Sequence, residues 1–273
     1  MRVCCLGSGS GGNSLLVEVE GTRVLVDAGF SARDLEARLA SIDLEPAALD
    51  AILVTHDHSD HTKGVGVFAR RHGTPVYLTE RTRLACHALF RGDERTELYR
   101  VAHPFRLGGL RVEPFLTVHD AADPVGIALI DVATGARLGV ATDLGRPTAG
   151  MQHALSSCDF LVLEANHDEV MLRVGPYPWS VKARIASSHG HLSNRAAARF
   201  VGDLVHPRLA GILLAHLSNE CNDPGLAQEV VGTQLEQKRW HGWLGVAKQD
   251  KAGPMLDIET LRANSGPEQL SLL

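Results

Sequence analysis

One stretch of the sequence is more informative than any other: Ala51-Ile52-Leu53-Val54-Thr55-His56-Asp57-His58-Ser59-Asp60-His61. Its first four residues are apolar, which is typical of a short buried strand. The residues that follow bring three imidazoles and two carboxylates to the junction between that strand and a loop. Imidazole and carboxylate together favour a transition metal. The H-x-H-x-D-H spacing therefore predicts a metal site rather than a histidine-rich surface turn.

Three later segments each place one ligand-type residue directly after an apolar run. These residues are His119, Asp143 and His216. Strands of a sheet can deliver such residues to one end, where loops gather. Alone, each could be a cap, a turn residue or a satisfied surface histidine. Together with the first stretch they predict one site with enough ligands for two ions.

The composition is that of an ordinary globular enzyme. The chain has 273 residues, of which 44% are hydrophobic and 22% charged. The five cysteines are odd in number and lack paired spacing, so we expect reduced, buried thiols. No apolar stretch approaches the roughly 18 residues of a membrane span, and Gly7-Ser8-Gly9 comes too early for a secretory signal. We therefore expect a cytoplasmic protein with no membrane partner.

The charge distribution gives a mixed indication about partners. The net charge of −5 argues mildly against a nucleic-acid partner. However, residues 63–111 hold ten Lys or Arg and four Asp or Glu, a net +6, and residues 171–208 hold six and one, a net +5. These segments favour a polyanionic partner. Arginines spread over helix surfaces for solubility are the alternative.

The order of predicted elements indicates a layered α/β fold. Strands are predicted over residues 3–6, 14–19, 23–26, 51–54, 111–118, 125–132, 137–141, 160–164 and 211–215. Helices are predicted over residues 32–40, 63–72, 80–91, 150–157, 177–187, 193–204 and 223–237. This order fits two sheets packed face to face with helices outside, as one domain over residues 1–250. Periodicity is lost after about Asp250, so residues 251–273 are expected to form an extension or a loose tail.

The ligand residues, in this order and spacing, resemble those of the metallo-β-lactamase superfamily. The resemblance implies an αββα sandwich and two divalent ions, zinc or manganese. By motif order one ion would take His56, His58 and His119, the other Asp60, His61 and His216, and Asp143 would bridge them. Asp27 matches an acid that orients a ligand without binding the metal itself.

Longer motifs resemble the YycJ/WalJ-like subgroup of this superfamily. They span Leu6–Ser14, Val118–Gly126, Thr142–Gly145, Leu163–Asp168, Gly175–Trp179, Gly190–Asn194 and Ala215–Ser218. Members look like cytoplasmic 5′-to-3′ DNA exonucleases, with relatives in RNA processing. The resemblance therefore implies an enzyme with a DNA substrate, with RNA as an alternative and a homodimer left open. Ser187-Ser188-His189 departs from the pattern, because His189 could compete with His191.

The expected mechanism is hydrolysis of a phosphodiester. Two ions about 3.5–4 Å apart would activate a shared water, and the resulting hydroxide would attack phosphorus in line. The leaving alkoxide needs a general acid. The tRNase Z branch resembles this chain where a glutamate orients a later histidine, and Glu164 and His191 match those positions. We expect His191 to donate the proton, and we count Glu164 and the ligand Asp60 with it as catalytic. Helix capping is the alternative for His191, while His167 and Asp168 are left open between packing and substrate contact.

Three functions follow, of which a DNA phosphodiesterase or exonuclease is favoured. The second is a hydrolase of small cyclic phosphodiesters or thioesters on the same fold. The Glu164 and His191 pair argues against thioesters, because a thiolate leaving group hardly needs a proton. The third is a non-catalytic metal-binding regulator, against which the complete ligand set argues.

Overall fold

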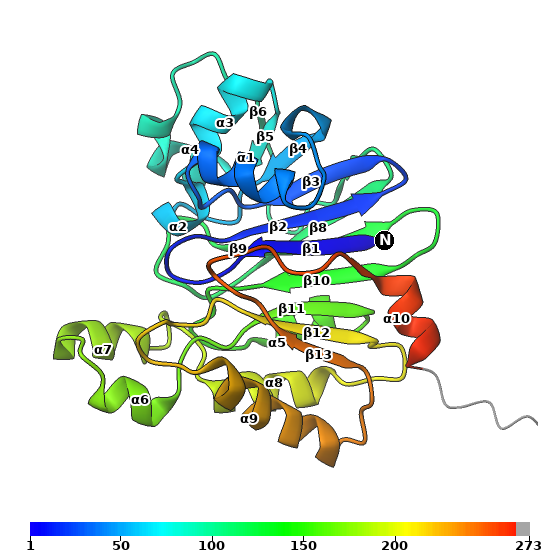
Figure 1. Cartoon of the computed structure of the whole chain (residues 1–273). Helices are drawn as coiled ribbons and strands as arrows, with labels where there is room; N and C mark the ends of the chain where they lie inside the picture. Colours follow the sequence, from blue (N-terminus) through cyan, green and yellow to red (C-terminus); the bar gives the residue numbers. More distant parts are fainter. Residues whose placement is uncertain (266–273) are drawn as a thin grey trace, which may run out of the picture.

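Two mixed β-sheets pack face to face in the computed structural model, which describes residues 1–265 (Figure 1). Over these residues the strand orders are β14-β1-β2-β3-β4-β5-β6 and β13-β12-β11-β10-β9-β8-β7. The first sheet contains β1 (Arg2–Gly7), β2 (Ser14–Val19), β3 (Thr22–Val26), β4 (Ala51–Leu53), β5 (Val76–Leu78), β6 (Thr96–Leu98) and β14 (Leu256–Asp257). The second contains β7 (Phe105–Leu107), β8 (Leu110–Leu116), β9 (Val125–Asp131), β10 (Arg137–Ala141), β11 (Phe160–Glu164), β12 (Gly211–Ala215) and β13 (Trp243–Val246).

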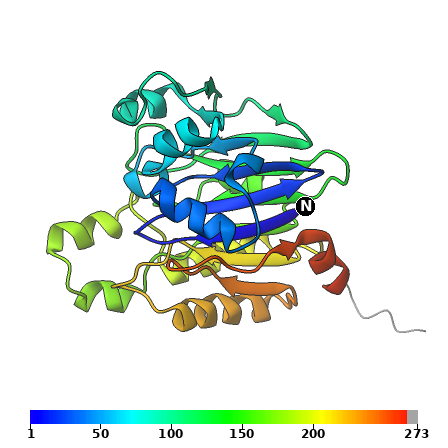
Figure 2. The same ribbon diagram turned by 45° about the horizontal axis from the view of Figure 1, so that its top comes forward.

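Helices cover the outer faces of both sheets (Figure 2). They are α1 (Ala32–Ala40), α2 (Ser59–Thr62), α3 (Val65–His72), α4 (Glu80–Ala85), α5 (Ala149–Leu155), α6 (Glu169–Val174), α7 (Trp179–Ile185), α8 (Asn194–Leu204), α9 (Pro224–Gln237) and α10 (Ile258–Asn264), with 3₁₀ turns at Pro46–Ala48 and His87–Leu89. α1 and α3 pack on the first sheet, while α5, α8 and α9 pack on the second. The predicted αββα sandwich is confirmed.

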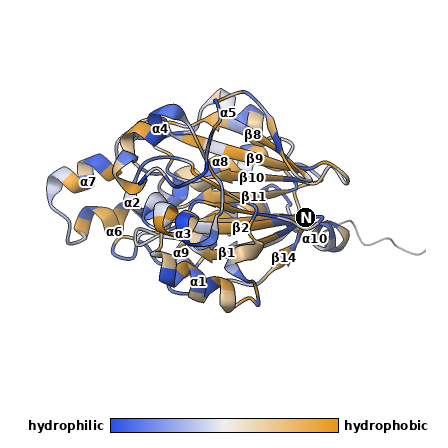
Figure 3. Ribbon diagram, turned by 90° about the horizontal axis from the view of Figure 1, so that it is seen from above, coloured by the Kyte–Doolittle hydropathy of each residue, from blue (hydrophilic) through white to orange (hydrophobic). Residues whose placement is uncertain are grey.

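The strands are apolar on both faces because each sheet is covered on both sides. In β1, Val3 and Cys5 point into the layer between the sheets, while Cys4 and Leu6 pack beneath α1 and α3. Successive side chains of a strand point to opposite faces of the sheet. In a sheet that is covered on both faces, the sequence of each strand is therefore a continuous apolar run. The central strands are accordingly mostly orange in Figure 3. Burial of one such Leu or Val side chain contributes about 1.5–3 kcal/mol.

Strand direction brings the predicted site residues to one end of the molecule. β3 runs parallel to β4, and β10, β11 and β12 run parallel to one another. β8 shares their direction, because it is antiparallel to β9, which is antiparallel to β10. The carboxyl ends of these strands therefore meet at one edge of the sandwich, the usual place for a ligand site in α/β sheets.

Three predicted helices are clearly shorter in the structure, one of them being α7, which was predicted over 177–187 and spans Trp179–Ile185. The helix predicted over 63–72 begins only at Val65, as α3, and the short α2 precedes it; the two are separated at Lys63 and Gly64, where a Cβ on Gly64 would lie 2.2 Å from Phe30 O. The helix predicted over 80–91 ends as α4 at Ala85 and continues as a 3₁₀ turn. The strands β5, β6, β7, β13 and β14 were not predicted, because runs of two to four residues show no clear period, and neither were the helices α6 and α10.

The segment after Asp250 adds to the first sheet. β14 pairs with β1, with Val3 opposite Leu256, and Ile258 of α10 is fully buried. Residues 251–265 thus form an ordered extension, while the remainder of the expected tail, 266–273, lies outside the described residues. The domain boundary near residue 250 stays a prediction.

Two expectations about the whole chain can be compared with the structure directly. All five cysteines are free and buried, as predicted. Over residues 1–265, none of the helices is both long and apolar enough to cross a bilayer.

Candidate metal centre and active site

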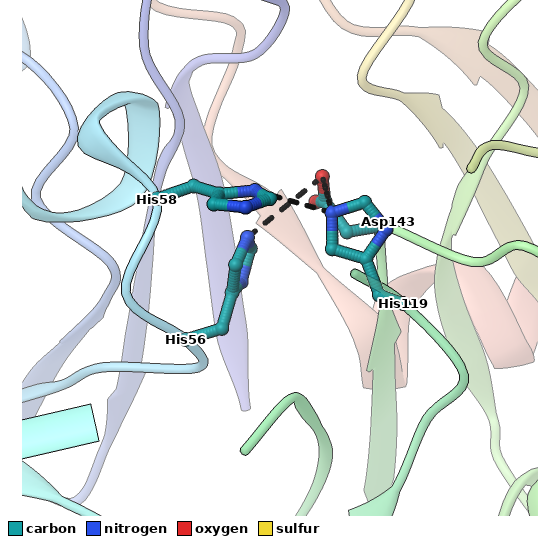
Figure 4. Close-up of side chains that lie close together, drawn as sticks. All are labelled: His56, His58, His119 and Asp143. Carbon is teal, nitrogen blue, oxygen red and sulfur yellow. Dashed lines mark hydrogen bonds and ion pairs between the residues drawn. The ribbon is translucent and has the colours of Figure 1, made fainter. Parts of the chain in front are cut away.

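The predicted metal ligands form two groups that share one carboxylate, Asp143. Within each group the ligand atoms lie within 4.8 Å of one another. The groups are His56, His58, His119 and Asp143, and Asp60, His61, Asp143 and His216. Figure 4 shows the first group, in which side chains from the loop after β4 face His119 and Asp143 from the second sheet. The structure thus brings all seven predicted ligands together at the interface of the sheets.

Asp143 lies at the centre of the cluster and is 2% exposed. Its Oδ1 is 3.9 Å from His56 Nε2 and 3.6 Å from His119 Nε2. Its Oδ2 is 3.1 Å from His61 Nε2. Oδ1 also lies 3.4 Å from His216 Nδ1. The carboxylate therefore lies close to both groups, as expected of a bridging ligand.

Four of the imidazoles are held from behind, so that Nε2 points inward. The contacts are His56 Nδ1 with Thr55 Oγ1 (3.0 Å), His61 Nδ1 with Asp27 Oδ2 (2.7 Å), His119 Nδ1 with Gly190 O (3.0 Å) and His216 Nδ1 with Glu164 Oε1 (2.8 Å). Partners of this kind fix the tautomer and direction of metal-binding histidines. Asp27 also accepts from the Thr55 backbone and hydroxyl, so it joins β3 to the ligand loop.

The donor atoms fit a bound cation. His56 Nε2 and Asp143 Oδ2 are buried and make no well-aligned hydrogen bond within residues 1–265, although Oδ2 lies 3.1 Å from His61 Nε2. Buried polar atoms without partners are rare, because desolvation without compensation costs about 1–3 kcal/mol each. A divalent ion among these nitrogens and oxygens satisfies both atoms. The mixture of imidazole and carboxylate suits zinc or manganese better than a hard ion such as calcium.

The buried carboxylates of the cluster favour positive charge on the groups around them. Burial lowers the pKa of His216, but Asp143, Asp60 and Glu164 outweigh it and raise that pKa to about 10. Burial likewise opposes protonation of His61, yet Asp143 and Asp27 raise its pKa well above 6.5. In metal-free protein, bound protons therefore supply the positive charge. Metal binding must displace these protons.

The backbone is strained at three of these positions. Asp27, Asp143 and His216 have φ values of 64°, 59° and 56°. Non-glycine residues seldom adopt this left-handed region, and such outliers gather at functional sites. Each residue follows the last residue of a strand by one or two positions, so the turn aims its side chain across the sheet edge.

Glu164 and His191 form the predicted pair beside the cluster. His191 Nδ1 lies 2.8 Å from Oε1 of the fully buried Glu164, and His191 lines the cavity. Burial lowers the His191 pKa, but the Glu164 carboxylate outweighs it and raises that pKa. The same Oε1 holds His216, and Oε2 accepts from the backbone of Leu144 and Leu192. Burial raises the Glu164 pKa, but His191 and His216 reverse this and lower it to about 2.

Glu164 therefore has a wider role than the sequence indicated. Its predicted partner was His191 alone, whereas in the structure Glu164 contacts the ligand His216 at the same distance. Only the parallel pairing of β11 with β12, which places Glu164 beside Ala215, could have indicated this second contact.

The glycine-rich loop after β1 supports the ligand loop. Asn13 Nδ2 lies 3.1 Å from His61 Nε2 and 3.3 Å from Asp60 Oδ2. The backbone of Asn13 donates to Asp60 O at 2.8 Å. A Cβ at Gly29 would lie 1.7 Å from that same oxygen, so the close approach requires glycine. The loop belongs to the motif Leu6–Ser14, but the sequence alone predicted no role for Asn13.

Three residues that the sequence left open lie apart from the cluster. His189 is exposed and its Nδ1 is 3.2 Å from Ser188 Oγ, so it does not compete with His191 in this structure. Asp168 caps α6 by accepting from the Val170 and Met171 backbone. His167 is 3% exposed, and burial lowers its pKa.

A cavity of about 320 Å³ opens over the cluster. It is lined by Asp60, Asp143, His191 and His216 together with Ser10, His58, Ser59, Asn166, Tyr177, Arg184, Ile185 and Ser218. Arg184 Nε donates to Asp120 Oδ2 at 2.5 Å, and Asp120 Oδ1 is 3.4 Å from His119 Nε2. Tyr177 and Arg184 could not be predicted as lining residues from the sequence, because their segment approaches the site only in the folded chain.

The sequence matches known proteins over most of its length. A family model described as a beta-lactamase superfamily domain matches residues 22–212. Exodeoxyribonuclease YycJ of Bacillus anthracis is 39% identical over 236 residues, which cover 85% of this chain and 88% of that protein. Exodeoxyribonuclease WalJ of Streptococcus pneumoniae serotype 2 is 37% identical over 236 residues, covering 85% and 87%.

Solved structures show the same fold at low identity. The metallo-beta-lactamase fold protein YhfI from Bacillus subtilis matches with a TM-score of 0.71 and 16% identity, covering 92% of this chain and 98% of that one. Human tRNase Z, short form, matches with a TM-score of 0.66 and 16% identity, covering 94% and 100%. At these identities the likeness shows the fold alone.

Proposed function

This chain belongs to the beta-lactamase superfamily, in the family of the YycJ and WalJ exodeoxyribonucleases, and from that premise we propose that it is a metal-dependent 5′-to-3′ DNA exonuclease. The observation that carries this proposal is the shared carboxylate of Asp143. It joins two ligand groups and lies 3.8 Å from His191 Nδ1, the ring of the proposed proton donor. Metal binding and proton transfer are thereby concentrated in one small cavity.

The seven ligands would hold two divalent ions, zinc or manganese. His56, His58 and His119 form one face of the site, Asp60, His61 and His216 the other, and Asp143 lies between them. Bound there, two such ions supply a water of lowered pKa and offset negative charge on a phosphoryl oxygen. Asp27 and Glu164 keep their histidines directed toward the ions, and Asn13 holds the Asp60 loop in place.

His191 supplies the proton for the leaving group. Its Nδ1 is engaged by Glu164, so Nε2 is the nitrogen left for the substrate in the cavity. Burial lowers the His191 pKa, but the Glu164 carboxylate outweighs it and raises that pKa, which favours the protonated ring. The leaving alkoxide of a phosphodiester is strongly basic and takes this proton as its bond to phosphorus breaks. Glu164 acts through His191 and is a positioning residue in that step.

DNA is the proposed substrate because of the relatives and the charge distribution. The relatives named as exodeoxyribonucleases match 85% of this chain. Although the whole chain carries a net charge of −5, residues 63–111 carry +6 and residues 171–208 carry +5. Arg184, which pairs with Asp120, belongs to the second of these segments and lines the cavity. Lysine and arginine side chains bind the phosphate backbone of DNA whatever its base sequence. A cytoplasmic location belongs to the same proposal.

The direct test is degradation of end-labelled polymers. Single- and double-stranded DNA and RNA, each labelled at the 5′ or the 3′ end, are incubated with the protein and zinc, manganese or a chelator. The proposal predicts early release of label from 5′-labelled DNA, dependent on metal and slower for RNA. Early release from 3′-labelled DNA would reverse the proposed polarity. Turnover of a small thioester or cyclic phosphodiester without DNA degradation would replace the proposed substrate.

A further inference from the structure

The segment from α6 to α7, residues 169–185, forms an arm that leaves the body of the molecule. Figure 1 shows both helices reaching beyond the sheets, on the side that carries the ligand loops. Within the described chain, α7 has no buried residue and α6 buries only Leu172. Lys182 Nζ donates to Arg173 O at 2.9 Å and so ties the two helices together. The arm is therefore a defined element that the core does not cover.

The arm exposes apolar side chains to an unusual degree. Four of the nine large apolar side chains exposed over residues 1–265 belong to it: Val170, Val174, Trp179 and Val181. Trp179 is 81% exposed, the largest value of the nine. An aromatic ring of this size is seldom left in water without a partner, because its burial dominates the energy of the contacts it makes. Trp179 also lies in the motif Gly175–Trp179, to which the proposed mechanism gives no role.

The charge and position of the arm indicate which class of partner contacts Trp179. Over the arm, residues 169–185, the three bases Arg173, Lys182 and Arg184 face one acid, Glu169, which bonds to Ser193 of the core at the start of α6. The arm is continuous with the candidate active site, because Tyr177 and Arg184 line the same cavity as the metal ligands. A partner of the arm must therefore be polyanionic, must offer flat apolar surfaces and must enter the cavity. Single-stranded DNA has all three properties, because its bases alternate with phosphates along a flexible chain.

We propose that the α6–α7 arm is the platform on which the single-stranded end of the substrate lies, with Trp179 stacking on a base and Arg173, Lys182 and Arg184 contacting phosphates. This inference rests on the proposed exonuclease function and adds a binding determinant to it. Stacking on an aromatic side chain tolerates any base, as an exonuclease requires. The arm therefore holds the strand, while the cavity performs the chemistry.

The test compares a DNA substrate with one too small to reach the arm. Holoenzymes carrying Trp179→Ala, Trp179→Phe and Trp179→Leu are assayed on a single-stranded oligonucleotide and on bis(p-nitrophenyl) phosphate. Loss of a stacked base weakens binding by about 5-fold to 100-fold, so Trp179→Ala should raise KM for DNA by that factor. Trp179→Phe should restore most of the affinity, and Trp179→Leu should not. Leu98→Ala is the matched control, since Leu98 is 54% exposed on β6 and does not line the cavity.

The small substrate separates failure of this inference from failure of the proposed function. All variants should hydrolyse bis(p-nitrophenyl) phosphate at the wild-type rate. An oligonucleotide with an abasic site at the stacked position should bind wild type and Trp179→Ala equally. An unchanged KM for DNA in Trp179→Ala would overturn the inference while leaving the exonuclease intact. The inference would also be overturned if the only change in Trp179→Ala were the loss of a dimer in size-exclusion chromatography. A wild-type enzyme that cleaves the small ester but not DNA would contradict the proposed function itself.

Discussion

At the scale of single residues, two buried carboxylates organise the site. Asp143 faces both ligand groups, and Glu164 holds one ligand, His216, and the proposed acid, His191. Because Glu164 Oε1 contacts both histidines, metal binding and proton donation share one support. Substitution of the acid and substitution of its support should therefore give different results.

Substitution of the proposed acid should affect only substrates that need a proton. His191→Ala should slow hydrolysis of DNA by about 10²–10⁴-fold, the usual contribution of general acid catalysis. A nitrophenyl phosphodiester should be much less affected, because its leaving group is a weak base. Metal content, measured on the same preparation, should stay at the wild-type level. The matched control is His189→Ala, two positions away and exposed. Equal slowing of both substrates, or loss of a metal, would make His191 a ligand or a structural residue.

Substitution of Glu164, which supports His191, should also affect metal binding. In Glu164→Gln, an NH₂ group replaces one of the two carboxylate oxygens. This group then faces either the two imidazoles or the backbone N–H groups of Leu144 and Leu192, which are donors themselves. Loss of such a supporting carboxylate typically costs about 10–100-fold in metal affinity or activity. We therefore expect weaker metal retention during dialysis against a chelator, together with slower hydrolysis of both phosphodiesters. Glu113→Gln, on β8 among Arg111 and Arg137, should change neither. Full metal retention in Glu164→Gln would show that His216 needs no such support.

At the scale of elements, the ligand loop depends on the segment beneath it. Gly29 follows β3, and the Asp60 peptide packs directly on it, while Ala28 N donates to His61 O at 2.9 Å. Asn13, from the loop after β1, bonds to the same Asp60 peptide. Two turns from the first sheet thus fix the position of the Asp60 and His61 side chains.

A methyl group at Gly29 should displace the ligand loop without unfolding the chain. Gly29→Ala would place its Cβ 1.7 Å from Asp60 O, so the loop must move. We expect loss of at least one metal ion per chain and of most activity, measured by elemental analysis and DNA degradation. Gly150→Ala is the control, because an added Cβ there would lie 3.8 Å from its nearest neighbour, Thr148 Oγ1, and α5 favours alanine. Wild-type metal content in Gly29→Ala would mean that the ligand loop can move without loss of a metal ion, contrary to this prediction.

The sequence predicted the long elements and the ligand set better than the short elements and the supports. Apolar runs such as β2, Ser14–Val19, and the residues that follow them are local patterns, so strands and ligands could be read together. The three-residue strands β5, β6 and β7 carry too few positions for a period to appear. The supporting role of Asn13 and the second contact of Glu164 depend on the packing of distant segments. Such contacts follow from the sheet order, which the sequence did not provide.

At the scale of the whole molecule, the unbalanced charge of the site links stability to pH. The pKa of His216 rises from 6.5 to about 10 in the folded, metal-free chain, and that of His61 also rises. A group with a raised pKa contributes stability that is complete below its unfolded pKa, near 6.5, and is lost as pH rises toward the folded value. Metal-free protein should therefore lose stability above neutral pH. Metal-loaded protein should not, because its ligands are already deprotonated.

This difference can be measured as the gap in Tm between metal-loaded and chelator-treated protein. The gap should widen from about pH 7 to about 8.5, which is below the ordinary thiol pKa of 9.0, where the buried cysteines begin to contribute. Differential scanning fluorimetry at several pH values gives both curves. The double variant His61→Gln/His216→Gln is the control, and its metal-free Tm should vary less with pH. Parallel curves for the two forms of the wild type would contradict the account of the site charge.

The most direct measurement of the central claim is the number of metal ions per chain in wild type and in Asp143→Asn, determined together with the rate of DNA degradation. Asp143 is the one carboxylate shared by both ligand groups, so the amide should weaken both. We predict close to two ions per chain in the wild type, clearly fewer in Asp143→Asn, and no detectable DNA degradation by the variant. An Asp143→Asn protein with two ions and the full rate would contradict the claim that this site is the catalytic metal centre.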